Sequence, residues 1–170
     1  VSSIENPDRN LHFKKFELSR DQHIELANLV INSGLKYSAS VWDIESIEWI
    51  DNYLEFYKIG SGDLTAYPLL RYFALKGKPI ILSTGLASEI EVLNAIEFIQ
   101  NINPKYSNAE MLAILQCTSM YPISNSDANL NVMKKFKNLY NLSIGYSDHT
   151  ESNQALLCAA TMGADILEFH

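Results

Sequence analysis

The chain has 170 residues, of which 47% are hydrophobic and 19% are charged, with a formal net charge of −7 at pH 7 and a pI near 5.0. This composition is typical of one globular domain with a sizeable core and excludes a largely disordered chain. The acidic balance and the lack of a basic run argue against nucleic acid or an anionic membrane as a partner. An anionic small molecule remains possible where a lysine or helix amino termini supply local positive charge.

The cysteines and the apolar segments indicate the compartment. Cys117 and Cys158 lack the spacing of a metal site, so we expect reduced thiols and a cytoplasmic protein. The first residues do not have the layout of a signal peptide, and the longest apolar stretch, 155–167, is interrupted by Gly163 and Asp165. Such a stretch is too short to span a bilayer, so we expect no membrane partner.

Helical and strand-like segments alternate along the chain from about residue 19. A capping box at Ser19 and Gln22 predicts a helix that ends at Gly34, and a second capping box at Ser88 and Glu91 opens another. After the first helix, the predicted elements are a strand at 36–41, a helix at 43–53, a strand at 54–59, a helix at 67–76, a strand at 79–83, the helix from 88, a strand at 112–117, a helix at 127–138, a strand at 142–146, a helix at 151–162 and a strand at 165–169.

The predicted strands are near-continuous apolar runs, which is typical of a parallel sheet covered by helices on both faces. Six such strands could form an open doubly wound sheet or most of a (β/α)8 barrel, the TIM barrel, which usually takes about 250 residues. The G-x-G-x-x-G motif of a dinucleotide-binding sheet is absent after the first strand. The chain also begins in a loop without methionine and stops at a strand end, His170. We therefore expect an α/β chain that covers roughly strands 3 to 8 of a TIM barrel.

Small clusters of polar residues follow the predicted strands. In a parallel sheet the carboxyl ends of the strands meet at one edge, where α/β proteins place their active sites. The clusters are Lys58 to Asp63, Ser83 to Gly85, Gln116 to Tyr121, Ser147 to His149 and Glu168 to His170.

Two histidines follow neighbouring strands in this pattern. His149 and His170 are one β/α unit apart, so adjacent parallel strands would bring them within reach of one metal ion. Two imidazoles suit a divalent transition ion, although nitrogen ligands alone do not choose among Mn, Fe, Co and Zn. The alternative is a pair of hydrogen-bonding histidines at a barrel rim. His12 and His23 receive no role.

Lys58 ends a mostly apolar strand, so its ammonium group should point into the mouth of the sheet edge. Such a lysine can bind phosphate or carboxylate as a point charge, form a Schiff base, or be a solvated rim residue. Asp63, Asp148 and Glu168 are candidate carboxylates that could also cap helices or orient a histidine. Hydroxyls at the strand ends indicate an oxyanion or phosphate pocket, although a single serine is more often a turn residue. They belong to Ser61, Ser83, Thr84, Ser119 and Ser147.

Five segments together resemble the sialic acid synthase family, the phosphoenolpyruvate-condensing enzymes that make N-acetylneuraminic, legionaminic and pseudaminic acids. They are KIGSGDLTAYPLL (58–70), GKPIILSTG (77–85), ILQCTSMYP (114–122), IGYSDHT (144–150) and ADILEFH (164–170). The resemblance implies a (β/α)8 barrel transferase that joins phosphoenolpyruvate to an open-chain N-acetylhexosamine at a Mn or Mg ion. N-acetylmannosamine or a related 2,4-diacetamido sugar would be the acceptor.

The resemblance also implies roles for individual residues. His149 and His170 would bind the metal, and Asp63 and Tyr121 would contact the acceptor and, with Lys58, form the catalytic set. Asp63 replaces the family's more common Glu with a shorter carboxylate, which leaves the identity of the acceptor open. The residues implied to hold phosphoenolpyruvate are Lys58, Ser61, Ser83, Ser119, Ser147 and Ser40, the last at a position where the family usually has Thr.

The family pattern also includes parts that this sequence does not contain. These are a glutamate on strand one, a lysine on strand two and a C-terminal antifreeze-like domain that completes the acceptor site in a dimer partner. We therefore expect residues 1–170 to be the partial barrel of a longer, homodimeric protein. Two alternatives stay open at this point: a Schiff-base aldolase with Lys58 as its nucleophile, and a non-catalytic module that binds a sugar or phosphate.

Overall fold

A computed structural model describes residues 14–170, and a five-stranded parallel sheet forms its centre. The strands pair in the order in which they occur along the chain, which is the order of a barrel wall and not of a doubly wound sheet. They are β1 (Tyr57–Ile59), β2 (Ile80–Ser83), β3 (Leu112–Gln116), β4 (Ser143–Asp148) and β5 (Leu167–Phe169).

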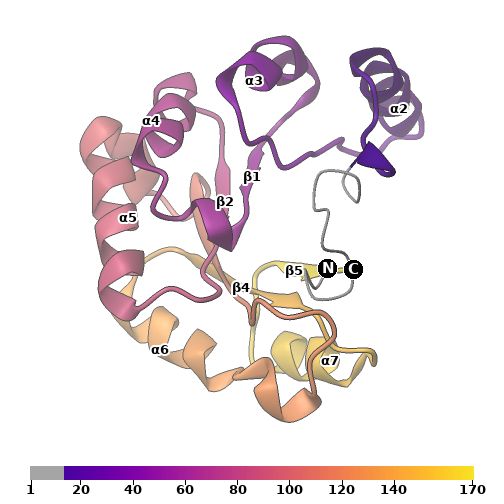
Figure 1. The fold of residues 1–170 in the computed structure, drawn as a ribbon. Helices are drawn as coiled ribbons and strands as arrows, with labels where there is room; N and C mark the ends of the chain where they lie inside the picture. The colour runs from indigo at the N-terminus through magenta and orange to yellow at the C-terminus, as the bar shows by residue number, and fades with distance from the viewer. Residues whose placement is uncertain (1–13) are drawn as a thin grey trace.

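Helices lie on the outer, convex side of the sheet, which is strongly curled (Figure 1). This arrangement is part of a (β/α)8 barrel, as the sequence predicts. The α-helices are α2 (Arg20–Asn32), α3 (Ile44–Ile50), α4 (Tyr67–Lys76), α5 (Glu89–Ile102), α6 (Asn131–Leu139) and α7 (Gln154–Thr161). Short 3-10 helices are η1 (Asp51–Tyr53), η2 (Ser61–Asp63), η3 (Pro104–Ser107) and η4 (Asn125–Ala128).

Helix starts follow the capping signals in the sequence. The side chains of Ser19 and Ser88 each accept a hydrogen bond from the backbone N–H three residues later, and Gln22 and Glu91 return a side-chain contact to the cap. The helix predicted at 43–53 is α3 followed by η1, and the helix predicted at 127–138 is divided into η4 and α6. Asn129, which adopts a left-handed backbone with φ 50°, separates these last two.

The strand predicted at 36–41 is not formed, so that prediction is wrong. Only Ser40 of this segment makes a β-bridge, which is parallel and pairs it with Lys58. Polar residues interrupt the segment, and Lys36 instead forms an ion pair with Glu55 at 2.7 Å on the surface. Its neighbour β1 is also only three residues long and offers few backbone partners. The described sheet therefore has five strands in place of the predicted six.

Alternate residues of each strand face opposite sides of the sheet. Tyr57 and Ile80 are buried in the core beneath the helices, and the ring of Tyr57 packs 4.5 Å from that of Phe73 in α4. Lys58 and Ser83 face the concave inner side, where their side chains meet. Within residues 14–170, no helix is both long enough and apolar enough to cross a membrane.

Candidate active site

Lys58 projects from the middle of β1 and is surrounded by three oxygen atoms. Its Nζ donates a hydrogen bond to Ser83 Oγ at 2.9 Å and to the carbonyl of Ile59 at 3.3 Å, and Glu168 Oε2 lies 3.4 Å away. The side chains of Lys58 and Glu168 are only 14% and 26% exposed. A fixed, sheltered positive charge therefore sits at the carboxyl edge of the sheet, a suitable place to bind an anion.

Two serines from distant parts of the chain meet close to β1, the strand that carries Lys58. Ser61 opens η2 and Ser119 follows β3, and their Oγ atoms are 2.9 Å apart. Gly85 lies against them, because a Cβ at this position would be 2.3 Å from Ser119 Oγ and 2.9 Å from Cys117 Sγ. Only glycine allows the ends of β2 and β3 to approach so closely. The N–H of Gly85 donates to Cys117 Sγ at 3.1 Å, and burial raises the pKa of this thiol.

His149 is buried directly after β4, and main-chain oxygens fix its ring. Its Nδ1 lies 2.6 Å from the carbonyl oxygen of Thr118 and 3.2 Å from that of Met120. A carbonyl can only accept, so Nδ1 carries the proton and Nε2 keeps its lone pair, which faces Ser147 Oγ at 3.5 Å. Burial lowers the pKa of His149, and the nearby His170 lowers it further, while the Thr118 carbonyl opposes the shift. The lowered pKa favours the neutral ring, which is the form that binds a metal.

The separation of His149 and His170 fits two ligands of one ion. Their ring centroids are 5.1 Å apart. Metal–nitrogen bonds of about 2.1 Å at tetrahedral or octahedral angles place two imidazole centroids about 4.5 to 5.3 Å apart. No group of three or more His, Cys, Asp or Glu side chains suited to a metal occurs in the part of the chain that the structure describes. Two histidines are thus the candidate protein ligands there.

Tyr121 packs against both rings of the histidine pair. Its ring stacks on that of His149 with centroids 3.8 Å apart and planes 25° from parallel. It meets the ring of His170 edge-on at 5.3 Å. About half of the surface of Tyr121 remains exposed, 51% by residue, so part of this residue is accessible from solvent.

The remaining predicted residues lie at the same edge in different settings. Ser147 is buried in β4, with its Oγ 3.5 Å from His149 Nε2. Asp63 ends η2 half-buried, and desolvation raises the pKa of its carboxyl group. Ser40 is exposed but is held beside Lys58 by its β-bridge. The structure thus brings the predicted set to one edge, with a candidate anion-binding side around Lys58 and a histidine side around His149.

Asp148 has a structural role, one of the alternatives that the sequence left open. It accepts hydrogen bonds from the hydroxyl of Tyr146 at 3.0 Å and from the backbone N–H of Thr150 at 2.9 Å. The hydroxyl of Thr150 donates to its second oxygen at 3.1 Å. These bonds use both carboxylate oxygens to shape the turn after β4, where His149 lies.

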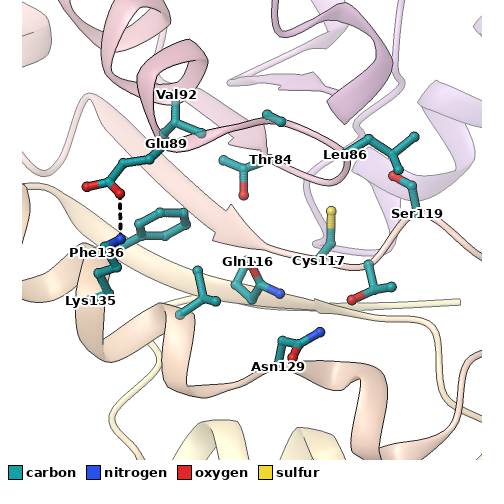
Figure 2. Close-up of a pocket in the computed structure, with 13 residues that line it drawn as sticks. Thr84, Leu86, Glu89, Val92, Gln116, Cys117, Ser119, Asn129, Lys135 and Phe136 are labelled. Carbon is teal, nitrogen blue, oxygen red and sulfur yellow. Dashed lines mark hydrogen bonds and ion pairs between the residues drawn. The ribbon is translucent and has the colours of Figure 1, made fainter.

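A pocket of about 330 Å³ borders the candidate anion-binding side but lies outside the barrel wall. Figure 2 shows it between the start of α5 and α6, with Gln116 and Cys117 below and Leu86 above. An ion pair between Glu89 and Lys135, 2.5 Å apart, closes one end. Neither Lys58 nor the histidine pair lines this pocket, although it shares Cys117 and Ser119 with the groups described above.

Comparisons with known proteins identify the family of this chain. The family model described as the NeuB family matches residues 4–170. The N,N'-diacetyllegionaminic acid synthase of Legionella pneumophila is 36% identical over 160 residues, which cover 92% of this chain and 44% of that protein. The human N-acetylneuraminate-9-phosphate synthase is 32% identical over 161 residues, which cover 94% of this chain and 43% of that protein.

A solved structure is also similar over nearly the whole chain. The N-acetylneuraminic acid synthetase of Leptospira borgpetersenii, determined in complex with citrate, matches with a TM-score of 0.86 and 26% identity. The match covers 99% of this chain and 59% of that one. The chain spans less than half the length of the two synthases from Legionella and human. From the family match and these similarities, the chain belongs to the NeuB family.

Proposed function

We propose that the protein condenses phosphoenolpyruvate with an open-chain N-acetylated hexosamine to give a nonulosonic acid and phosphate. The main support is one spatial relationship, in which the Lys58–Ser83 pair and the His149–His170 pair lie at the same edge of the sheet. An anion and an aldehyde could react between two such centres. Relatives in the family are named as synthases of legionaminic acid and N-acetylneuraminate 9-phosphate, products of this class.

Phosphoenolpyruvate would bind on the Lys58 side. The ammonium group supplies positive charge, and Ser83, Ser61, Ser119 and Ser147 supply hydroxyl donors at fixed positions. Ser40 would add a contact from the neighbouring segment. Donors held in advance around a phosphate stabilise the charge that grows as the phosphate leaves.

The acceptor sugar would bind on the histidine side. His149 and His170 would hold a divalent ion, Mn or Mg, which polarises the acceptor aldehyde as a Lewis acid when it is bound. Tyr121 would contact the sugar with its hydroxyl, and Asp63 would accept hydrogen bonds from sugar hydroxyls. N-acetylmannosamine and 2,4-diacetamido sugars are the proposed acceptors.

The proposed reaction forms one carbon–carbon bond, consumes one water and breaks one carbon–oxygen bond. The enol carbon of phosphoenolpyruvate forms a bond with the aldehyde carbon, and water adds to the cationic carbon that results. The C–O bond to phosphate then breaks, and phosphate leaves with the bridging oxygen. The oxygen from water loses its protons and becomes the keto oxygen, while the aldehyde oxygen takes up one proton and becomes a hydroxyl; the other proton goes to phosphate or solvent. Lys58 and the serines bind the leaving group throughout, so their contribution is electrostatic and not covalent.

Incubation of the full-length protein with phosphoenolpyruvate, Mn²⁺ and a series of N-acetylated hexosamines tests the proposal. We expect acceptor-dependent phosphate release and a nine-carbon or related keto acid product by mass spectrometry. Phosphoenolpyruvate consumption that needs no acceptor, or none at all with every sugar, would contradict it. We also propose that the protein is a cytoplasmic homodimer, which light scattering and cell fractionation can check.

The Schiff-base alternative is disfavoured by the surroundings of Lys58. A nucleophilic lysine needs an apolar pocket or a neighbouring cation, whereas Lys58 lies beside the carboxylate of Glu168. Borohydride treatment in the presence of pyruvate distinguishes a Schiff-base aldolase from the condensing synthase. An adduct on Lys58 supports an aldolase, and its absence supports the condensing synthase.

A further inference from the structure

Glu168 has an unusual environment for a carboxylate. Its Oε2 is the one fully buried side-chain nitrogen or oxygen, within the described residues 14–170, that has no hydrogen-bond partner. Lys58 Nζ is 3.4 Å away, close enough for an ion pair but without the geometry of a hydrogen bond. A buried carboxylate oxygen without a hydrogen bond is costly, because it loses its water and gains no donor.

The contact also crosses the inside of the barrel. Lys58 lies on β1 and Glu168 on β5, at the two ends of the strand order, so only the curvature of the sheet brings the side chains together. Lys58 and Glu168 therefore face each other across the concave side. This is the side on which the anion-binding hydroxyls lie.

The surroundings of Lys58 show how an arriving anion must bind. An ammonium group has three N–H donors, and three oxygens already surround this one. They are Ser83 Oγ at 2.9 Å, the Ile59 carbonyl at 3.3 Å and Glu168 Oε2 at 3.4 Å. Ser83 and Ile59 accept hydrogen bonds from the ammonium group, so a phosphate oxygen that binds the third N–H must approach where Glu168 Oε2 lies. Glu168 makes the longest contact and is the only anion of the three, so it is the group that an anionic ligand would displace.

We propose that Glu168 is a resident counter-ion of Lys58, which competes with the phosphate-bearing substrate for the ammonium group. It is a positioning residue that acts through Lys58, and this role rests on the proposed function. When the site is empty, Glu168 holds Lys58 toward the centre of the barrel. When an anion is bound, the carboxylate stays nearby and weakens binding, so that both substrate and phosphate product are held less tightly than Lys58 alone would hold them.

The binding of inorganic phosphate to the full-length protein tests this role directly. Glu168→Gln keeps the shape of the side chain and removes its charge. We expect its dissociation constant for phosphate, measured by isothermal titration calorimetry at fixed pH and ionic strength, to fall about tenfold, the size expected from the loss of one partly screened like charge near the anion. The KM for phosphoenolpyruvate should fall in the same direction.

Two further variants make the test specific. Glu110→Gln removes the same charge from an exposed position just before β3, at the opposite edge of the sheet, and should leave the phosphate affinity unchanged. Glu168→Asp keeps the charge but draws it back from Lys58, so its affinity should fall between those of the parent and Glu168→Gln. Thermal unfolding of each variant reports whether it is folded, and Glu168→Asp supplies the test if Glu168→Gln does not fold.

Phosphate affinity that is unchanged or weaker in Glu168→Gln overturns the counter-ion role, as does equal tightening in Glu110→Gln. Phosphate binding requires no turnover, so this result is independent of the reaction. Tighter phosphate binding in a protein that shows no synthase activity supports the counter-ion and contradicts the proposed function. Normal synthase activity in a protein whose phosphate affinity is unchanged by Glu168→Gln supports the proposed function and contradicts the counter-ion.

Discussion

The ring of Tyr121 lies flat on the ring of His149, with centroids 3.8 Å apart, and meets His170 edge-on at 5.3 Å. One side chain thus packs against both candidate metal ligands. Packing of this kind restricts the orientation of an imidazole, while the phenol hydroxyl can form a hydrogen bond of its own. We therefore expect the ring and the hydroxyl of Tyr121 to make separate contributions.

Two substitutions separate these contributions. Tyr121→Phe keeps the stacked ring, so it should leave Mn²⁺ affinity unchanged and raise the KM for the acceptor about tenfold through the loss of one hydrogen bond. Tyr121→Ala should weaken Mn²⁺ binding as well. Equal Mn²⁺ affinity in the parent and in Tyr121→Ala would mean that the stack does not support the metal site.

His149 and His170 should each be required for tight metal binding. In the full-length protein, His149→Ala or His170→Ala should lower Mn²⁺ affinity by a factor of about 100 or more, since each removes a direct ligand. His23→Ala is the matched control, because His23 lies near α3 with its Nδ1 3.0 Å from the hydroxyl of Tyr37. Electron paramagnetic resonance of free Mn²⁺ measures the Mn²⁺ affinity of the three variants. Unchanged affinity in both His149→Ala and His170→Ala would exclude these histidines as metal ligands.

Gly85 should be intolerant of even one added methyl group. In Gly85→Ala the new Cβ would collide with Ser119 Oγ and Cys117 Sγ, so Ser119 must move away from Ser61. We expect weaker phosphoenolpyruvate binding, by about tenfold, with a small loss of stability. Gly62→Ala is the control, because no atom lies within 4 Å of its added Cβ. Similar KM values for phosphoenolpyruvate in both variants would show that the Ser61–Ser119 contact is dispensable.

The carboxylate of Asp63 should lower the stability of the folded protein while it contributes to acceptor binding. Desolvation raises the pKa of its carboxyl in the folded protein, so the stability it contributes is present at low pH and is lost as the pH rises through the folded pKa. Asp63→Asn removes the desolvated charge, and its melting temperature should exceed that of the parent by an amount that grows between about pH 4 and pH 7. Its KM for the acceptor should rise. A stability difference that is constant with pH, measured by differential scanning calorimetry, would argue against this origin.

Much of the fold could be predicted because parallel barrel strands are apolar on both faces. The runs that became β2, β3 and β4 have this pattern, and the capping boxes at Ser19 and Ser88 marked two helix starts. The strand predicted at 36–41 is not formed, because polar residues interrupt the segment and its neighbour β1, only three residues long, offers few backbone partners. Only the bridge of Ser40 to Lys58 remains.

The grouping of the candidate site residues could also be predicted, because parallel strands place their carboxyl ends at one edge whatever the details of packing. The sequence pattern does not predict which main-chain atoms or which residues from across the barrel contact these side chains. The carbonyl of Thr118 sets the tautomer of His149, and any residue could have provided that oxygen. The contact between Lys58 and Glu168 depends on the curvature of the whole sheet. Glu168 was recognisable only as a carboxylate at a strand end.

The role of Lys58 offers the most direct measurement. Phosphate release from phosphoenolpyruvate should be followed for the full-length protein and for its Lys58→Ala and Lys58→Arg variants, with Mn²⁺ and N-acetylmannosamine or a 2,4-diacetamido sugar. We expect release in the parent, a KM for phosphoenolpyruvate raised by a factor of about 100 in Lys58→Ala, and partial rescue in Lys58→Arg, because the positive charge persists. Release that continues at the parent's rate and KM in Lys58→Ala would contradict the placement of phosphoenolpyruvate at Lys58.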